Sequence, residues 1–207
     1  MLLSGGIDSA TCAYLAKGRY RLRALTFEYR GIVRGEIVAA RGVAHSAGVA
    51  AHSFFRLPDL REAGDIPGFN RGEMPPTYIP MRNGIFYSVA ASVAEEVGAD
   101  AIIGGHNKDD ARTFVDAGPD FFNQLQRSMW AGSRFLRSKR IKILRPLGGR
   151  TKVQVIRLAE SLGVPFEETW SCHRQGKTHC WKCDGCLARI WAFIEAGVAD
   201  PLRETRG

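Results

Sequence analysis

The apolar residues of this chain fall into two alternating patterns along its length. Short apolar runs and strict apolar–polar alternation predict β-strands, whereas apolar positions three and four residues apart predict helices. Strands are predicted at residues 1–3, 22–29, 51–57, 101–105 and 141–144. Helices are predicted at residues 7–17, 36–47, 82–97, 119–130, 151–162 and 187–195. The first strand is unusually short, so we expect the native chain to start upstream of Met1.

Local signals mark the ends of several predicted helices. Gly48, Gly98 and Gly163 each follow a helix, where glycine favours termination because it readily takes the left-handed conformation. Thr151 suits an N-cap position, and Pro119 suits a first helical turn. Residues 58–80 instead contain five prolines and little periodicity, which predicts a long loop. Loops of that length commonly serve as lids or binding loops.

The alternation of strands and helices predicts an α/β fold. Its expected architecture is a single doubly wound, Rossmann-like parallel sheet covered by helices on both faces. No internal repeat or linker divides the chain, and the cysteine-rich end is predicted to be a small C-terminal appendage. In such folds ligands bind at the carboxyl ends of the strands.

Composition adds limits to this picture. The 207 residues are 45% hydrophobic, enough for one well-buried domain of this class. No apolar run approaches the roughly 18 residues of a membrane span, and the first residues lack the features of a secretory signal. We therefore expect a cytoplasmic protein that does not enter the membrane. The net charge of +8 favours anionic partners such as nucleotide phosphates or RNA.

Four of the five cysteines lie close together near the C-terminus. Their spacing is Cys172-x7-Cys180-x2-Cys183-x2-Cys186, which lets four thiolates close a tetrahedral site. Clustering and an odd total argue against a disulfide framework. We expect one structural Zn²⁺, with an iron–sulfur cluster as the alternative. The neighbouring histidines at 173 and 179 are candidate substitutes in the ligand set, and Cys12 is expected in the core.

A glycine-containing turn follows the first strand and precedes the first helix. The segment SGGIDS at residues 4–9 combines two glycines, which allow close approach of an anion, with the free N–H groups of a helix start. A carboxylate beside phosphates implies Mg²⁺ between them, and Asp8 occupies that place. The alternative is a simple turn in which Asp8 and Ser9 cap the helix.

The same segment resembles the SGGxDS pyrophosphate loop of the N-type ATP pyrophosphatases, also called the PP-loop superfamily. Further segments narrow the resemblance: YIPMRN at 78–83, GHNKDD at 105–110, FVD at 114–116, PDF at 119–121 and TWSC at 169–172. With the four cysteines they resemble the 7-cyano-7-deazaguanine synthase family from residue 2 to about residue 195.

This resemblance implies an adenine nucleotide alpha-hydrolase-like fold and a defined reaction. A PP-loop ATP pyrophosphatase domain would span residues 1–165, and a four-cysteine zinc segment with a packed helix would span 166–207. The family is an ATP-dependent ligase that converts 7-carboxy-7-deazaguanine and ammonia to 7-cyano-7-deazaguanine, a precursor of queuosine and archaeosine. ATP with Mg²⁺ and a homodimer are expected, whereas direct binding of nucleic acid is not.

The resemblance also implies which residues bind the nucleotide. The pyrophosphate and its Mg²⁺ would be held by Ser4, Gly5, Gly6, Asp8 and Ser9. The remainder of ATP would contact Leu3, Thr26, Phe27 and His106. Asp8 and Lys152 are expected to be catalytic, since Lys152 begins a helix and can stabilise charge developing on the phosphates. An ordinary exposed lysine near an N-cap is the alternative.

Substrate contacts are implied at the other motifs. Arg82, a third expected catalytic residue, suits an anionic substrate together with Asn83, unless it only bonds loop carbonyls. A guanine-like edge would be bound by Asn107, Asp110 and Asp116, although Asp110 could instead anchor its loop. Stacking on the deazapurine would come from Tyr78 and Phe114, for which local packing is the alternative.

The chain departs from the family pattern at two places. Residues 30–33 are RGIV where the family often has Gly-Gln-Arg-His, and residues 115–118 are VDAG where it often has Pro-Asp-Cys-Arg. Two alternative functions use related chemistry: a tRNA-thiolating adenylase, whose GHxxDD motif the segment at 105–110 resembles, and a paralogue that acts on another macromolecule. A zinc-bearing nucleic-acid module is a third alternative, which leaves Asp8 without a role.

Overall fold

The structure is a computed structural model, and it describes residues 1–70, 72, 74 and 78–204. Its strands are β1 (Arg23–Tyr29), β2 (Ala51–Leu57), β3 (Ala101–Ile103) and β4 (Lys142–Leu144). Its helices are α1 (Ile7–Ala16), α2 (Arg34–Ser46), α3 (Arg82–Glu96), α4 (Asp110–Thr113), α5 (Pro119–Gly132), α6 (Arg134–Ser138), α7 (Lys152–Ser161), α8 (Asp184–Ala196) and α9 (Pro201–Glu204). None of the helices in this part of the chain is long and apolar enough to cross a membrane.

The strands form two parallel pairs, which the first residues of the chain connect. β1 pairs with β2, and β3 pairs with β4. Between the pairs, the Leu2 N–H donates to the Ile103 carbonyl and the Leu3 N–H donates to the Leu25 carbonyl, each at 2.9 Å. Residues 1–3 therefore occupy the centre of a parallel arrangement in the order β2, β1, 1–3, β3, β4. They form only an isolated bridge between Leu2 and Leu25 instead of the predicted strand, because the chain turns away at Ser4.

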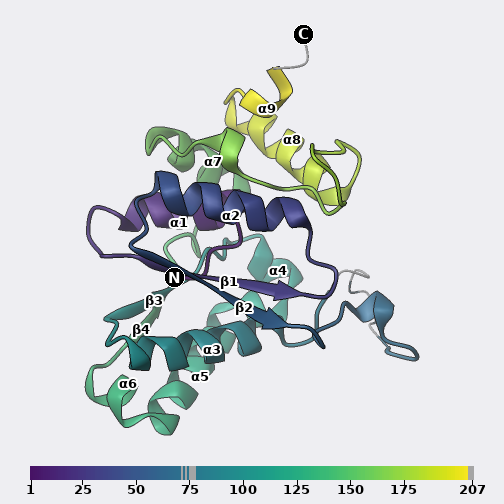
Figure 1. Cartoon of the computed structure of the whole chain (residues 1–207). Helices are drawn as coiled ribbons and strands as arrows, with labels where there is room; N and C mark the ends of the chain where they lie inside the picture. The colour runs from purple at the N-terminus through teal and green to yellow at the C-terminus, as the bar shows by residue number, and fades with distance from the viewer. Residues whose placement is uncertain (71, 73, 75–77, 205–207) are drawn as a thin grey trace.

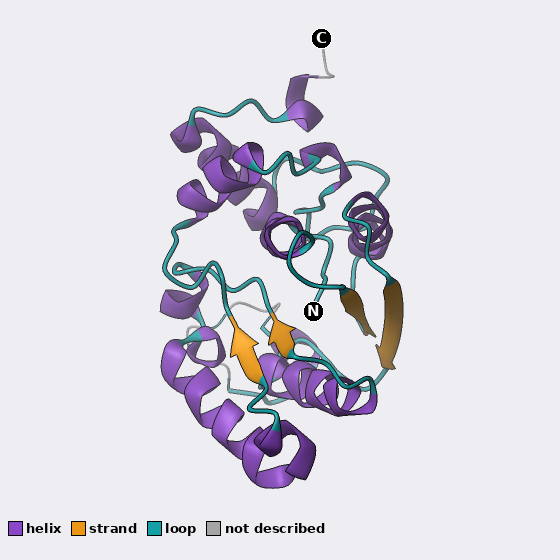
Figure 2. Ribbon diagram, turned by 90° about the vertical axis from the view of Figure 1, so that its left-hand side faces the viewer, coloured by secondary structure: helices purple, strands orange, loops and turns teal. Residues whose placement is uncertain are grey.

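Helices cover both faces of this arrangement (Figures 1 and 2), which confirms the predicted doubly wound α/β fold. On one face the core contains Leu3, Ala24 and Ile103 with residues of α1, α2, α7 and α8. On the other face it contains Leu25 and Ile102 with residues of α3, α5 and α6. Adjacent strand residues point to opposite faces, so Ala24 and Leu25, like Ile102 and Ile103, enter different cores.

Most predicted boundaries agree with the structure. Gly48, Gly98 and Gly163 all have φ between +65° and +68°, as expected for residues that follow a helix. Thr151 forms a capping box with Gln154 at the start of α7. The short helices α4, α6 and α9 were not predicted, because four or five residues are too few to show a helical period.

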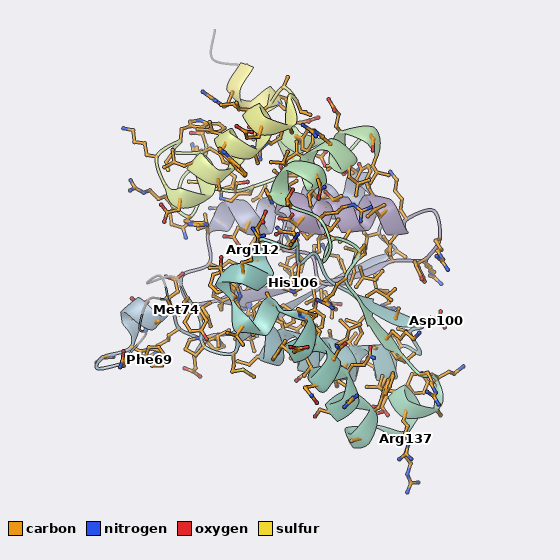
Figure 3. The ribbon with its side chains drawn as sticks, turned by 180° about the vertical axis from the view of Figure 1, so that it is seen from behind. Phe69, Met74, Asp100, His106, Arg112 and Arg137 are labelled. Atoms are coloured by element: carbon orange, nitrogen blue, oxygen red, sulfur yellow. The ribbon has the colours of Figure 1, made fainter. Side chains whose placement is uncertain are left out.

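The long predicted loop projects beyond the carboxyl ends of β1 and β2 (Figure 1) and contains one short 3-10 helix, Ala63–Asp65. Its residues 71, 73 and 75–77 lie outside the described part of the chain. Figure 3 shows Phe69 of this loop at the edge of the molecule and His106 near its centre. The part of the loop that returns toward the body, Tyr78 and Ile79, reaches the site described below.

A buried arginine holds the parts of the C-terminal segment together. Arg189 of α8 pairs with both carboxylate oxygens of Asp200, at 2.7 and 2.8 Å. It also donates to the Thr169 hydroxyl at 2.9 Å and to the Phe166 carbonyl at 3.0 Å. Its side chain is fully buried. The division of the chain at residue 165 stays a prediction.

Candidate functional site

Residues 4–9 form a compact loop between the central segment and α1. Ser9 organises it, because its hydroxyl accepts from the Ser4 N–H at 3.2 Å and donates to the Gly6 carbonyl at 3.0 Å. Gly6 is the N-cap of α1 and provides no side-chain cap, so the first N–H groups of this helix stay available. Such a helix start attracts anions. Gly5 has a φ of +83°, and a Cβ there would lie 2.5 Å from the Glu36 carbonyl.

Asp8 is the centre of a polar network built from three distant segments. Its carboxylate forms an ion pair with the ammonium group of Lys152, whose side chain is only 23% exposed. Asn107 donates to the other oxygen of Asp8 at 3.3 Å. The Lys152 N–H in turn donates to Asp109 at 2.8 Å. The structure therefore brings together Asp8, Asn107 and Lys152, although their catalytic and binding roles stay predictions.

The GHNKDD segment places a second carboxylate close to Asp8. Asn107 shapes the turn, because its side-chain oxygen accepts from the N–H groups of Asp109 and Asp110 at 2.7 and 3.0 Å. Burial raises the pKa of Asp110 to about 6, and the negative charge of Asp8 adds to this. Burial also lowers the pKa of His106 to about 4, so its imidazole is neutral at pH 7. The Asp8 and Asp110 carboxylates and the nearby serine hydroxyls are the oxygen ligands that suit Mg²⁺.

A cavity of about 560 Å³ extends from this loop along the carboxyl ends of the strands. Its volume lies in the range of small-molecule sites. The predicted site residues that line it are Leu3, Ser4, Gly6, Asp8, Ser9, Thr26, Phe27, Tyr78, Arg82, Asn83, His106, Asp110, Phe114 and Asp116. Gly5, Asn107 and Lys152 do not line it, although Asn107 and Lys152 contact Asp8, which does.

Aromatic rings form part of the cavity wall. Phe27 stacks on Phe86 with ring centroids 4.0 Å apart. Tyr78 and Phe114 are nearly parallel, with 8° between their planes and centroids 6.2 Å apart. These faces suit a flat heterocycle. Thr26 has less capacity to contact a ligand, because its hydroxyl already donates to the Leu3 carbonyl.

Asn83 is largely committed to holding the wall together. Its N–H donates to the Asp116 carboxylate at 3.1 Å, and its side-chain amide donates to the Asp116 carbonyl at 2.9 Å. These bonds attach the start of α3 to the turn at Val115–Ala117. Arg82, the preceding residue, forms no ion pair within the described residues. Its guanidinium interacts with the Tyr29 hydroxyl but has no carboxylate partner there, which leaves its charge for an anionic ligand.

Several lining residues were not predicted from the sequence. Among them are Tyr29, Glu36, Glu62, Phe86 and His173. Burial raises the pKa of Glu36 to about 7, which the charge of Arg82 opposes and that of Glu62 reinforces. A glutamate in the first turn of an amphipathic helix gave no local signal of burial. Only the packing of α2 against the loop at residues 4–9 places it there.

The four clustered cysteines converge on one point, as predicted. Their sulfur atoms all lie within 4.8 Å of one another, with Cys180 and Cys186 at 3.9 Å and Cys172 and Cys183 at 3.8 Å. Zinc–sulfur bonds of ~2.3 Å in a tetrahedron require sulfurs about 3.8 Å apart. Backbone N–H groups of residues 174 and 180 donate to Cys172 at 3.4 Å. The cluster is therefore suited to one metal ion such as zinc.

Known proteins similar in sequence to this chain share one description. The family model described as queuosine biosynthesis protein QueC matches residues 1–197. A protein of Thermoplasma acidophilum named 7-cyano-7-deazaguanine synthase is 37% identical over 215 residues, covering 98% of this chain and 90% of that protein. A protein of the same name from Thermosynechococcus vestitus is 38% identical over 218 residues, covering 98% and 93%.

A solved structure supports the fold. NMN synthetase from Francisella tularensis superposes with a TM-score of 0.54, covering 96% of this chain and 76% of that chain at 17% identity. At that identity the likeness concerns the fold alone. It agrees with the doubly wound architecture derived from the strand order and the two cores.

Proposed function

The chain belongs to the QueC family of queuosine biosynthesis proteins, and from this premise we propose that it is an ATP-dependent synthase that makes 7-cyano-7-deazaguanine from 7-carboxy-7-deazaguanine and ammonia. The observation that carries the proposal is the single cavity that joins the phosphate loop to Arg82 and the aromatic wall. Such a cavity accommodates a nucleotide and a flat anionic acceptor side by side, as transfer of an adenylyl group requires.

The proposed chemistry proceeds through two adenylations. The substrate carboxylate attacks the α-phosphate of ATP and releases pyrophosphate, and ammonia then displaces AMP to give the amide. A second ATP adenylates the amide oxygen, and loss of AMP and a proton gives the nitrile. In each activation the N–H groups at the start of α1 and the ammonium of Lys152 stabilise the charge that develops on the departing pyrophosphate.

We assign Mg²⁺ to the oxygen atoms of Asp8 and Asp110, which both line the cavity near the phosphate loop. When bound, the ion neutralises charge on the phosphates and makes pyrophosphate a better leaving group. Burial and, after it, the charge of Asp8 raise the pKa of Asp110, and the second cause supports this assignment, because two neighbouring carboxylates without a cation between them repel. Arg82 is assigned to the anionic acceptor, since its guanidinium has no carboxylate partner among the described residues.

We infer that the four-cysteine site holds zinc with a structural role. The sulfur spacing favours one ion over an iron–sulfur cluster, whose sulfur ligands attach to different irons and stand further apart. Four thiolates also leave no open position for catalysis. The site would fix the segment that contains Trp170, whose backbone N–H donates to the Gly5 carbonyl at 3.0 Å. A homodimer and a cytoplasmic location complete the proposal.

One observation disfavours a tRNA-thiolating activity. Such an enzyme needs an accessible catalytic cysteine, and Cys12 is fully buried among α1 and the central residues. Burial raises the pKa of its thiol far above the usual value, so it is not a nucleophile at pH 7. The other four cysteines converge on the metal site.

The proposal is tested with the purified protein, ATP, MgCl₂, ammonium and 7-carboxy-7-deazaguanine. Mass spectrometry should detect the nitrile, AMP and pyrophosphate, and Asp8→Asn should reduce turnover by at least about 100-fold. A matched control is Asp120→Asn, an exposed carboxylate at the start of α5. ATP turnover that depends on tRNA instead of the deazaguanine acid would contradict the proposal.

A further inference from the structure

The carboxylates that line the cavity differ in their hydrogen-bond partners. Asp8 is paired with Lys152, Asp110 accepts from the Asn107 N–H at 3.0 Å, and Asp116 accepts from the Asn83 N–H at 3.1 Å. These bonds hold the walls of the site and occupy one oxygen each of Asp110 and Asp116, and the proposed Mg²⁺ takes further oxygens of Asp8 and Asp110. The use of Asp110 and Asp116 for a guanine-like edge, which the sequence led us to expect, is correspondingly restricted.

Glu36 and Glu62 line the same cavity without such partners. Among the described residues, no N–H or O–H group donates a hydrogen bond to either carboxylate. Glu36 comes from the first turn of α2, whereas Glu62 precedes the 3-10 helix of the long loop. Burial raises the pKa of both carboxyl groups, and the charge of Arg82, which forms no ion pair with either, opposes this only in part. A desolvated carboxylate without donors is unfavourable, so these groups are suited to a ligand that brings donors.

The proposed substrate has two such donors side by side on one edge. The six-membered ring of a 7-deazaguanine carries a ring N–H beside an exocyclic amino group, and two parallel N–H groups match the two oxygens of one carboxylate. The reacting carboxylate stands on the five-membered ring. With that group directed toward the phosphate loop, the donor edge lies along another part of the cavity wall, and this wall includes the carboxylates of Glu36 and Glu62.

We propose that Glu36 determines specificity for the guanine-like base by accepting hydrogen bonds from its ring N–H and amino groups, with Glu62 beside it. This inference rests on the proposed function. The position of Glu36 also supports it: its own backbone carbonyl faces Gly5, so α2 sets the distance between the phosphate loop and this carboxylate. The adjacent Gly35 packs directly against the ring of Trp170, which leaves α2 little freedom to shift.

The test compares two ligands on the wild-type protein and on Glu36→Gln. The ligands are 7-carboxy-7-deazaguanine and its analogue that lacks the 2-amino group, and their Kd values are measured by calorimetry with the Mg²⁺-bound protein. The wild type should prefer the amino-bearing ligand by about 10- to 100-fold. Glu36→Gln should lose most of that preference, because an amide offers one acceptor oxygen and one clashing donor.

Two controls separate this role from a structural one. Glu36→Gln should bind ATP as the wild type does, and Glu160→Gln, an exposed residue of α7, should keep the ligand preference. If Glu36→Gln keeps the preference for the amino-bearing ligand while the wild-type protein converts the acid, this inference is overturned and the proposed function stands. Failure of the wild type to bind or convert the acid at all would overturn both.

Discussion

Replacing Asp200 with alanine provides a stringent test of how much the buried Arg189–Asp200 ion pair stabilises the C-terminal segment. The change removes the partner of Arg189, whose side chain is 0% exposed, and so leaves a buried guanidinium with its charge uncompensated. Two short hydrogen bonds to the carboxylate are lost, while those to the Thr169 hydroxyl and the Phe166 carbonyl remain. Removal of one partner from a buried ion pair costs about 3–5 kcal/mol of unfolding free energy.

For a chain of this length each kcal/mol corresponds to roughly 2–4 °C in Tm. We therefore expect Asp200→Ala to lower Tm by about 6–20 °C in thermal unfolding followed by circular dichroism, with zinc present throughout. The control Arg203→Ala removes an exposed charge of α9 and should change the unfolding free energy by less than about 0.5 kcal/mol.

A second variant distinguishes the loss of the pair from the loss of packing. Replacing both residues, as Arg189→Met with Asp200→Ala, removes the charge and its partner together, so it should cost less than Asp200→Ala alone. If Asp200→Ala lowers the unfolding free energy by under about 1 kcal/mol, Arg189 is not the buried anchor described above. A double variant less stable than the single one would refute the electrostatic reasoning in the same way.

Three further predictions address the loop, the metal cluster and the cavity. Gly5→Ala should abolish ATP binding in a titration, because its Cβ would collide with the backbone of α2. In the control Gly163→Ala the Cβ meets no neighbour, so the unfolding free energy should fall by only about 1 kcal/mol. Cys180→Ser, or a strong chelator, should release one equivalent of metal and lower Tm, which metal analysis and calorimetry check; unchanged Tm after metal loss would contradict a structural role. The pKa of Glu36 in the folded protein, about 7, exceeds its ordinary value, so the contribution of this residue to stability is lost as pH rises from about 4.5 through 7. Glu36→Gln should therefore be more stable than the wild type at pH 8. A lower Tm of the variant at that pH would count against this.

Local signals in the sequence were sufficient to identify many of the residues that line the candidate site. The glycines and serines of residues 4–9 indicate a tight turn before a helix, and the spacing of the four cysteines indicates that their sulfur atoms converge. Each motif therefore predicts its local geometry from neighbouring residues. The same holds for the end of α7 at Gly163 and its start at Thr151, since helix caps involve neighbouring residues only. The strand at residues 1–3 was less accurate, because three residues contain little pattern.

What the sequence alone determined is thus the order of the main strands and the longer helices, the loop at residues 4–9 and the four-cysteine cluster, all of which depend on residues near one another in the chain. The tertiary structure alone decided which partners meet. Asp8 and Lys152 are separated by 144 positions, and the placement of Glu36 in the cavity depends on the packing of α2 against the loop at Gly5. Periodicity and backbone preference act over a few residues, whereas burial and charge pairing are properties of the folded chain.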